Sequence, residues 1–136
     1  MKRRKFLIAL GAVPPLVLSA CKKDEPNPPT IFTGYVIDEN DKPVEGTGFI
    51  FGGDSGGFNG KITFFVETKT DAKGYYYLEA VITKDTAGTE FKPTEGDGKY
   101  TDGLYKRLCL VNGIYQKEIP WLANKKNELN FKIVKR

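Results

Sequence analysis

Carboxylates are the side chains of this 136-residue chain with the clearest capacity for acid–base or metal chemistry. The chain contains no histidine, which excludes Ser-His-Asp catalysis, Cys-His catalysis and ordinary zinc sites. A carboxylate pair could still cleave a glycosidic bond, and the carboxylates available for it are Asp38, Glu39, Asp41, Asp71, Asp97 and Asp102. Each lies in a predicted turn, where Asp bonds to the backbone that follows it. We therefore expect no enzyme activity, no catalytic residue and no cofactor.

Calcium is the other use for these carboxylates, because it takes oxygen ligands from flexible loops. Residues 38–41 (Asp-Glu-Asn-Asp), or Asp97 with Asp102, could supply such oxygens from adjacent loops. Neither group matches the pattern of a calcium-binding loop. The sequence therefore predicts no metal site.

Aromatic side chains beside the irregular segments of the C-terminal half offer a different kind of site. Aromatic faces stack on sugar rings or anchor contacts with proteins. The alternative is that these rings cap the ends of a hydrophobic core. The possible ligand-binding residues are Trp121, Tyr100, Tyr105 and Tyr115, with Trp121 the foremost candidate because it follows Pro120.

The two cysteines have different surroundings in the sequence. Cys109 lies in an apolar run with no evident neighbour to lower its pKa, so we expect a small buried hydrophobe. Cys21 follows a basic cluster at residues 2–5 and an interrupted apolar stretch too short to span a bilayer. Small side chains, Ser19 and Ala20, stand immediately before Cys21, as a processing peptidase requires.

The Leu18-Ser19-Ala20-Cys21 stretch resembles the lipobox of bacterial lipoproteins. The resemblance implies that residues 1–20 are a cleaved signal peptide and that Cys21 carries diacylglycerol on its sulfur and an acyl chain, such as palmitate, on its amine. Each buried CH₂ contributes about 0.8 kcal/mol, so several chains hold a protein on a membrane. An ordinary secretory signal ahead of a chance thiol is the alternative. Residues 3–7 also resemble a twin-arginine export signal, with general secretion as the other route.

Residues 21–30 form a charged, proline-rich stretch that predicts a flexible tether. Residues 22–25 (Lys-Lys-Asp-Glu) resemble the signal that sends Bacteroidetes lipoproteins to the outer face of the outer membrane, and a merely soluble linker is the alternative. Removing residues 1–20 lowers the Lys and Arg count from 21 to 17, which equals the 17 Asp and Glu. This balance predicts no nucleic-acid partner. We expect the protein in the cell envelope, lipid-anchored to the outer membrane.

Residues 31–136 predict one all-β domain, an antiparallel β-sandwich of about seven strands. Runs of β-branched and aromatic residues alternate with turns rich in Gly, Asp, Asn and Pro. Gly74 is available for positive φ, and Asn112-Gly113 predicts a hairpin turn. The expected strands are residues 31–38, 47–51, 61–68, 75–83, 104–111, 114–119 and 128–134, with at most a short strand near residues 90–92.

Three segments resemble the carboxypeptidase regulatory-like domain: residues 34–38 (Gly-Tyr-Val-Ile-Asp), 42–46 (Lys-Pro-Val-Glu-Gly) and 68–75. The likeness covers residues 33 to about 78. It implies a transthyretin-like sandwich, a common non-catalytic module of exported Bacteroidetes proteins. The matched positions are structural, since Gly34 permits close backbone approach and Pro43 pre-sets a turn. The sequence departs from the family pattern after Gly46, so the order of the later strands stays open.

Together these patterns predict a membrane-anchored, exported, non-catalytic protein whose sandwich binds a partner protein in the envelope. A glycan-binding module that uses the loop aromatics is the alternative. A carboxylate-based hydrolase is the third possibility, and it would need two loop carboxylates that face each other across a cleft.

Overall fold

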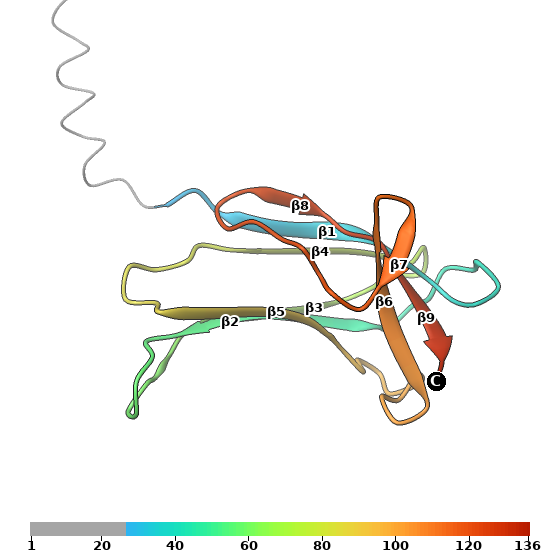
Figure 1. The fold of residues 1–136 in the computed structure, drawn as a ribbon, viewed down its shortest axis with the longest axis horizontal. Helices are drawn as coiled ribbons and strands as arrows, with labels where there is room; N and C mark the ends of the chain where they lie inside the picture. The colour runs from blue at the N-terminus through green and yellow to red at the C-terminus, as the bar shows by residue number, and fades with distance from the viewer. Residues whose placement is uncertain (1–26) are drawn as a thin grey trace, which may run out of the picture.

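The computed structural model describes residues 27–136. The predictions for the signal peptide, the twin-arginine motif and lipidated Cys21 lie outside the described residues. Within them the chain forms nine strands in two sheets that face each other (Figure 1). The strands are β1 (Thr30–Ile37), β2 (Gly48–Asp54), β3 (Ile62–Lys69), β4 (Tyr75–Ala80), β5 (Gly88–Thr94), β6 (Tyr105–Val111), β7 (Ile114–Gln116), β8 (Lys126–Glu128) and β9 (Phe131–Lys135).

The larger sheet has the strand order β4-β1-β9-β6-β7, and β8 also pairs with β1. β1 runs antiparallel to β4 but parallel to both β8 and β9. The smaller sheet has the order β3-β2-β5, with both pairings antiparallel. β2 is therefore the central strand of a three-stranded sheet whose outer face has no further layer over it in the described part of the chain (Figure 1).

The core between the two sheets consists mainly of aromatic rings. Phe32 of β1 stacks on Phe91 of β5 with ring centroids 3.7 Å apart, and Phe49 of β2 stacks on Tyr76 of β4 at 4.0 Å. Phe32 also makes an edge-to-face pair with Phe51 at 4.9 Å, a geometry that adds to the free energy gained by burial. The buried apolar side chains are Phe32, Val36, Val44, Phe49, Phe51, Tyr76, Leu78, Phe91, Cys109, Leu129, Phe131 and Ile133.

A break separates β8 from β9 at Leu129 and Asn130, opposite Gly34 of β1. The Leu129 carbonyl accepts a hydrogen bond from the buried Tyr76 hydroxyl at 2.8 Å, so it faces into the core and not along the sheet. The side chain of Asn130 replaces the missing backbone partner, since its Oδ1 accepts a hydrogen bond from the Tyr35 N–H at 2.9 Å. Backbone groups at the break are thereby satisfied, as burial requires.

The predicted all-β sandwich is confirmed, and two of its details differ from the sequence prediction. Nine strands replace about seven, because residues 88–94 form a full strand and the closing segment is divided at Asn130. The sandwich is also not purely antiparallel, since β8 and β9 run parallel to β1. β2 extends to Asp54, into the stretch predicted as a loop, because β3 and β5 both pair with it there.

Local turn chemistry follows the sequence closely. Gly74 has φ of +79°, and the Asp71 carboxylate accepts hydrogen bonds from the N–H groups of Lys73 and Tyr75, which closes the β3–β4 turn. Asn112 and Gly113 both have positive φ in the two-residue β6–β7 hairpin. The turn and hairpin predictions are therefore confirmed.

Candidate functional site

The six candidate carboxylates lie in the β1–β2, β3–β4 and β5–β6 connections, and each makes a hydrogen bond or an ion pair. The Asp38 carboxylate accepts hydrogen bonds from the N–H groups of Asn40 and Lys42. The bond from Lys42 keeps the pKa of Asp38 below its ordinary value, the opposite of what a general acid needs. Asp71 closes the β3–β4 turn, and the Glu39 carboxylate accepts a hydrogen bond from the Lys135 N–H at 3.0 Å.

The other three carboxylates form ion pairs. Asp97 lies 2.6 Å from the Lys69 ammonium, Asp41 lies 3.1 Å from Lys132, and Asp102 lies 2.7 Å from Arg107. The hydrogen bond to Asp97 raises the pKa of the exposed Lys69. Within residues 27–136, no three Asp, Glu, Cys or His side chains gather closely enough to hold a metal ion. These hydrogen bonds and ion pairs hold the loops in position.

Arg107 is the most constrained of these charged groups. Its side chain is only 5% exposed, and it donates to Asp102 Oδ1 at 2.7 Å and to the Tyr100 carbonyl at 2.6 Å. Its Nε is the one buried side-chain polar atom of the described residues without a hydrogen-bond partner. The guanidinium therefore fixes the β5–β6 loop to the body of the sandwich.

The four candidate aromatic residues lie at three separate locations in the sandwich. Trp121 packs edge-to-face on the core rings of Phe32 and Phe51, with centroids 5.3 and 5.4 Å away. Tyr100 and Tyr105 form an edge-to-face pair at 4.9 Å, and both pack against the core. Tyr115 lies beneath the Lys132 ammonium, 5.0 Å from the ring centroid. In the described structure no aromatic pair joins Trp121 to a candidate tyrosine, so the four do not form one platform.

Tyr100 also lines a hollow of about 560 Å³ at the end of the sandwich formed by the β1–β2 turn and the β5–β6 loop. This hollow brings together two of the candidate carboxylates, Asp38 and Asp97, and one candidate aromatic residue, Tyr100. Lys99 lies above the Tyr100 ring at 5.5 Å from its centroid. Asp38 is hydrogen-bonded within its own turn and Asp97 is paired with Lys69, which favours a structural role for both carboxylates.

A shallow groove along the outer face of β2 is the principal candidate site, and we call it the β2 groove. It has two hollows of about 530 and 330 Å³ that meet at Ile50. Its floor is low because the outward positions of β2 are Gly48, Ile50 and Gly52. The walls come from outward residues of β3 and β5, namely Phe65, Glu67, Lys69, Glu90 and Thr94.

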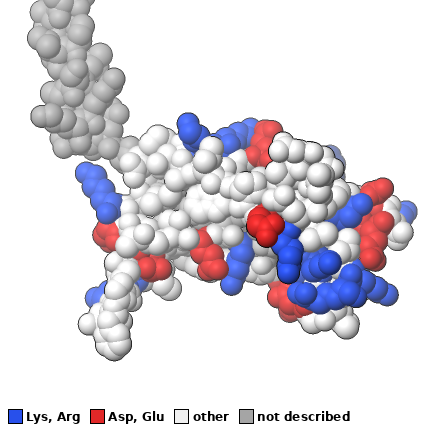
Figure 2. All heavy atoms as spheres, in the orientation of Figure 1, with Lys and Arg blue, Asp and Glu red and all other residues white. Residues whose placement is uncertain are grey.

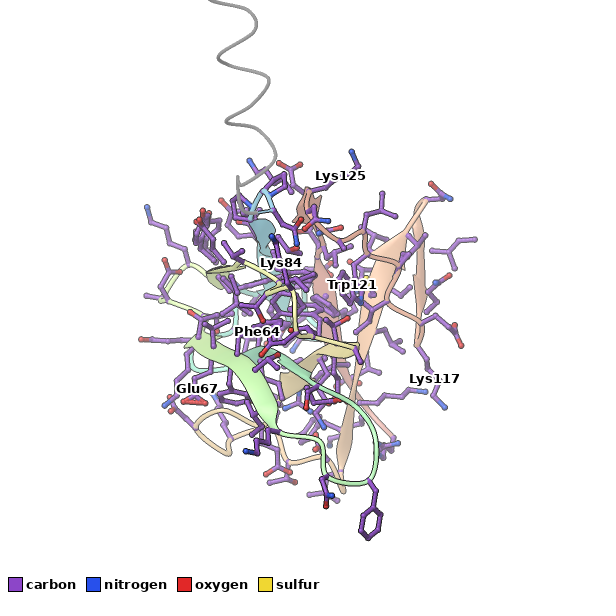
Figure 3. The ribbon with its side chains drawn as sticks, turned by 90° about the vertical axis from the view of Figure 1, so that its left-hand side faces the viewer. Phe64, Glu67, Lys84, Lys117, Trp121 and Lys125 are labelled. Atoms are coloured by element: carbon purple, nitrogen blue, oxygen red, sulfur yellow. The ribbon has the colours of Figure 1, made fainter. Side chains whose placement is uncertain are left out.

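The side chains of β3 and β5 leave little room above the glycines of β2. A Cβ atom at Gly48 would overlap the Thr94 hydroxyl, and one at Gly52 would stand 3.1 Å from the Phe65 ring. The Phe65 ring therefore leans over Gly52 while its side chain stays 52% exposed. Figure 3 shows the sandwich end-on, with Phe64 and Trp121 toward the interior and Glu67 at the outer edge. The groove thus combines one open aromatic face with carboxylate, ammonium and hydroxyl groups.

Sequence reasoning did not identify Phe65 as a binding residue. The predicted strand at residues 61–68 placed Ile62, Phe64 and Val66 on one face, and the same alternation puts Phe65 and Glu67 on the other. The Gly-x-Ile-x-Gly pattern of residues 48–52 was a second signal of a low strand face. Both signals became meaningful only with β2 as the central strand between β3 and β5.

Basic side chains gather at the end of the molecule where β6 begins and β9 ends (Figure 2). Lys106, Lys135 and Arg136 lie in this basic patch, and Arg136 donates a hydrogen bond to the Asp102 carbonyl at 2.6 Å. The patch joins residues from distant parts of the chain, which explains why the balanced total charge did not reveal it.

The thiol of Cys109 is fully buried, as predicted, and desolvation raises its pKa from 9.0 to about 11. Residues 27–136 contain no helix long and apolar enough to cross a membrane. No protein-family model matches the chain, and no curated protein matches it either.

Proposed function

We propose that the chain is an exported lipoprotein of the carboxypeptidase regulatory-like type, anchored to the outer membrane through a lipid on Cys21. Its sandwich is a non-catalytic module that binds a partner protein in the cell envelope. The lipobox supports the anchor, and β1 begins at Thr30, nine positions after Cys21. The fold would therefore sit close to the membrane that holds it.

The observation that carries the binding role is the β2 groove. It is a low, open strip over a central strand with glycine at two of its outward positions, and it offers apolar, charged and hydroxyl groups side by side. Protein interfaces combine such an apolar centre with a polar rim. The candidate carboxylates are engaged in turns and ion pairs, which supports a binding role over hydrolysis.

Backbone geometry at the family-like positions supports the resemblance. Gly46 and Gly74 have φ of +85° and +79°, which glycine adopts without strain. Gly34 lies against the Leu129 carbonyl with no room for a Cβ atom. The three glycines of the resembling segments thus occupy positions that demand glycine.

The anchor is tested by the intact mass of protein extracted from membranes, with Cys21→Ala and Cys109→Ala as matched variants. We expect a lipid-sized addition in wild type and in Cys109→Ala, and none in Cys21→Ala. Protease treatment of whole cells then reports whether the sandwich is outside. A wild-type mass without lipid would refute the anchor, and a signal peptide still attached to Cys21 would refute the processing site.

Thiol counting gives an independent readout of the same anchor. A thioether at Cys21 removes that thiol, and the buried Cys109 reacts only after unfolding. The acylated protein should show no reactive thiol when folded and one in denaturant. One reactive thiol in the folded protein and two in denaturant would identify unmodified Cys21.

A glycan is the second candidate ligand, favoured by one observation. The Phe65 face is open and is flanked by Glu67 and Glu90, which could accept hydrogen bonds from sugar hydroxyls. Calorimetric titration with envelope polysaccharides would test it. Binding lost on Phe65→Ala and retained in Tyr77→Ala, an exposed aromatic of the other sheet, would favour a glycan over a protein partner.

A further inference from the structure

Four segments of the sandwich meet at the end where the described chain begins. The Asn27 side chain donates to the Ile82 carbonyl at 2.9 Å, and the Asn124 N–H donates to the Thr30 hydroxyl at 2.7 Å. The β4–β5 loop then reaches β2, since the Ala87 N–H donates to the Asp54 carbonyl at 2.7 Å. Residues 27–30, 55–61, 81–87 and 122–125 therefore share one end, the left edge of Figure 1, and we call it the tether end.

The tether end is rich in exposed apolar side chains. Nine large hydrophobic side chains are exposed in residues 27–136, and four of them belong to this end or border it: Phe58, Ile62, Val81 and Leu122. Scattered exposed hydrophobics need no explanation, but a group that shares one end of a small domain marks an interaction surface.

Phe58 is the most exposed of the four. It is fully exposed at the tip of the β2–β3 hairpin, directly after Gly56 and Gly57. The hairpin is closed beneath it by a hydrogen bond from the Ser55 N–H to the Lys61 carbonyl at 2.9 Å. In Figure 1 this tip and the β4–β5 loop extend to the same left edge as the first described residues. A single flat surface could touch all three.

The charges of the tether end suit an anionic surface. Lys61, Lys84 and Lys125 are exposed there, and Figure 3, which views this end, labels the last two. Two carboxylates are also present, and both are engaged within their own loops. Asp54 accepts a hydrogen bond from the Gly56 N–H, and Asp85 accepts one from the Thr83 hydroxyl. Lysines beside exposed apolar side chains are typical of contact with lipid headgroups.

Chain length limits how far this end can lie from a membrane. Six residue steps join Cys21 to Asn27, which span at most about 20 Å when fully extended. A lipid on Cys21 would thus hold the tether end, and not the basic patch at the opposite end, near the headgroups. This step rests on the proposed lipid anchor.

We propose that the tether end is a second membrane contact, in which Phe58 enters the headgroup region of an anionic bilayer and Lys61, Lys84 and Lys125 lie on the headgroups. The lipid then fixes location, and the hairpin fixes orientation. In this orientation the Asp54 end of β2 lies near the membrane and the Gly48 end points away from it. The hollow of the β2 groove at Gly48 therefore stays accessible to a partner.

The test uses the acylated protein reconstituted in vesicles of phosphatidylethanolamine and phosphatidylglycerol. An environment-sensitive fluorophore is placed at Asn59→Cys, which keeps Phe58, and at Leu104→Cys, which reports the basic-patch end. The buried Cys109 stays unlabelled in folded protein, and wild type gives the background. The intact mass of the same preparation tests the anchor separately.

We expect the fluorophore at residue 59 to shift to the blue and to lose most of its emission to spin-labelled lipids, while the one at residue 104 does neither. Adding Phe58→Ser should abolish the shift at residue 59. Acylated protein with no shift at residue 59, or with the shift at residue 104 instead, would overturn the contact and leave the anchor standing. A fluorophore at residue 59 that is protected from solvent in cells but not in protein-free vesicles would also overturn the membrane contact, because a protein partner would then cover this end. A mass without lipid would overturn both proposals.

Discussion

Gly34 lies directly against the Leu129 carbonyl group, and a Cβ atom added to Gly34 would overlap that carbonyl oxygen. The carbonyl cannot move away, because it accepts the hydrogen bond of the buried Tyr76 hydroxyl at 2.8 Å. The contact joins β1, β4 and the β8–β9 break at one point. It is thus a backbone contact that one methyl group would disrupt.

We predict that Gly34→Ala lowers the free energy of unfolding by about 3 kcal/mol or more, because the clash involves backbone that cannot repack. Chemical denaturation measures the loss. Gly103→Ala is the matched control, since a Cβ atom at Gly103 meets nothing within 4 Å and its φ is not positive. Equal stability of the two variants would mean that the β8–β9 break is adaptable.

The strands around this contact differ in how well the sequence predicted them. Alternation predicted the strands β1 and β3, and Asn112-Gly113 predicted the hairpin of β6 and β7. The division of the last strand could not be predicted, because its cause is the Tyr76 hydroxyl, 53 positions away in the chain. The sequence predicted at most a short strand near residues 90–92 in place of β5, since most residues of β5 are polar, small or proline and its place in the sheet comes from pairing with β2.

The candidate site was less predictable than the fold. The type of a residue predicts what it can do, but the burial of Trp121 and the exposure of Phe65 depend on which strands lie beside them. Periodicity gives the two faces of a strand and not the neighbours on either side. The β2 groove therefore appears only once β3 and β5 flank β2.

We predict that Arg107→Lys lowers the free energy of unfolding by about 2 kcal/mol. A lysine cannot reach both Asp102 and the Tyr100 carbonyl, so one of these two hydrogen bonds of the buried residue 107 side chain is lost. Thermal unfolding measures the change. Hydrogen exchange should rise selectively in the β5–β6 loop.

Lys106→Ala is the control for Arg107, because Lys106 is the adjacent basic residue and has no ion pair in the described structure. It should leave stability nearly unchanged. Equal effects of both changes would indicate that the basic patch acts through its total charge and not through the Arg107 hydrogen bonds.

Cys109 should make the sandwich sensitive to alkaline pH. Its pKa is raised from 9.0 to about 11 in the fold, so the unfolded chain releases the proton first as pH rises. The stabilisation is therefore complete below pH 9 and is lost between pH 9 and about 11, at about 1.4 kcal/mol per pH unit. Denaturation midpoints of wild type and Cys109→Ala across this range measure it.

The Cys109→Ala variant should be less stable at neutral pH, because it leaves a small cavity, but its stability should fall less steeply above pH 9. Tyr76 remains in both proteins, and burial raises its pKa as well, so some alkaline loss persists. Parallel pH profiles for the two proteins would contradict the assignment to Cys109.

Trp121 should contribute to stability more than to ligand binding. Its ring packs on Phe32 and Phe51, so Trp121→Ala should lower the free energy of unfolding by about 3 kcal/mol, and Trp121→Phe by about 1 kcal/mol. Leu122→Ala, at an exposed neighbour, should have little effect. If Trp121→Phe kept full stability but lost polysaccharide binding, the ring would be a ligand contact after all.

The last prediction concerns the β2 groove itself. A photo-crosslinking phenylalanine analogue at Phe65 should join the protein to its partner in intact cells, because the Phe65 ring is half-exposed over Gly52. The same analogue at Tyr77, which is 45% exposed on the other sheet, is the matched control. Ile50→Lys, which puts a charge on the groove floor, should abolish the crosslink from residue 65 without unfolding the protein, since Ile50 is only partly buried. A crosslink from residue 77 alone would place the partner on the larger sheet. A crosslink that survives Ile50→Lys would mean that Phe65 touches its neighbour from outside the groove.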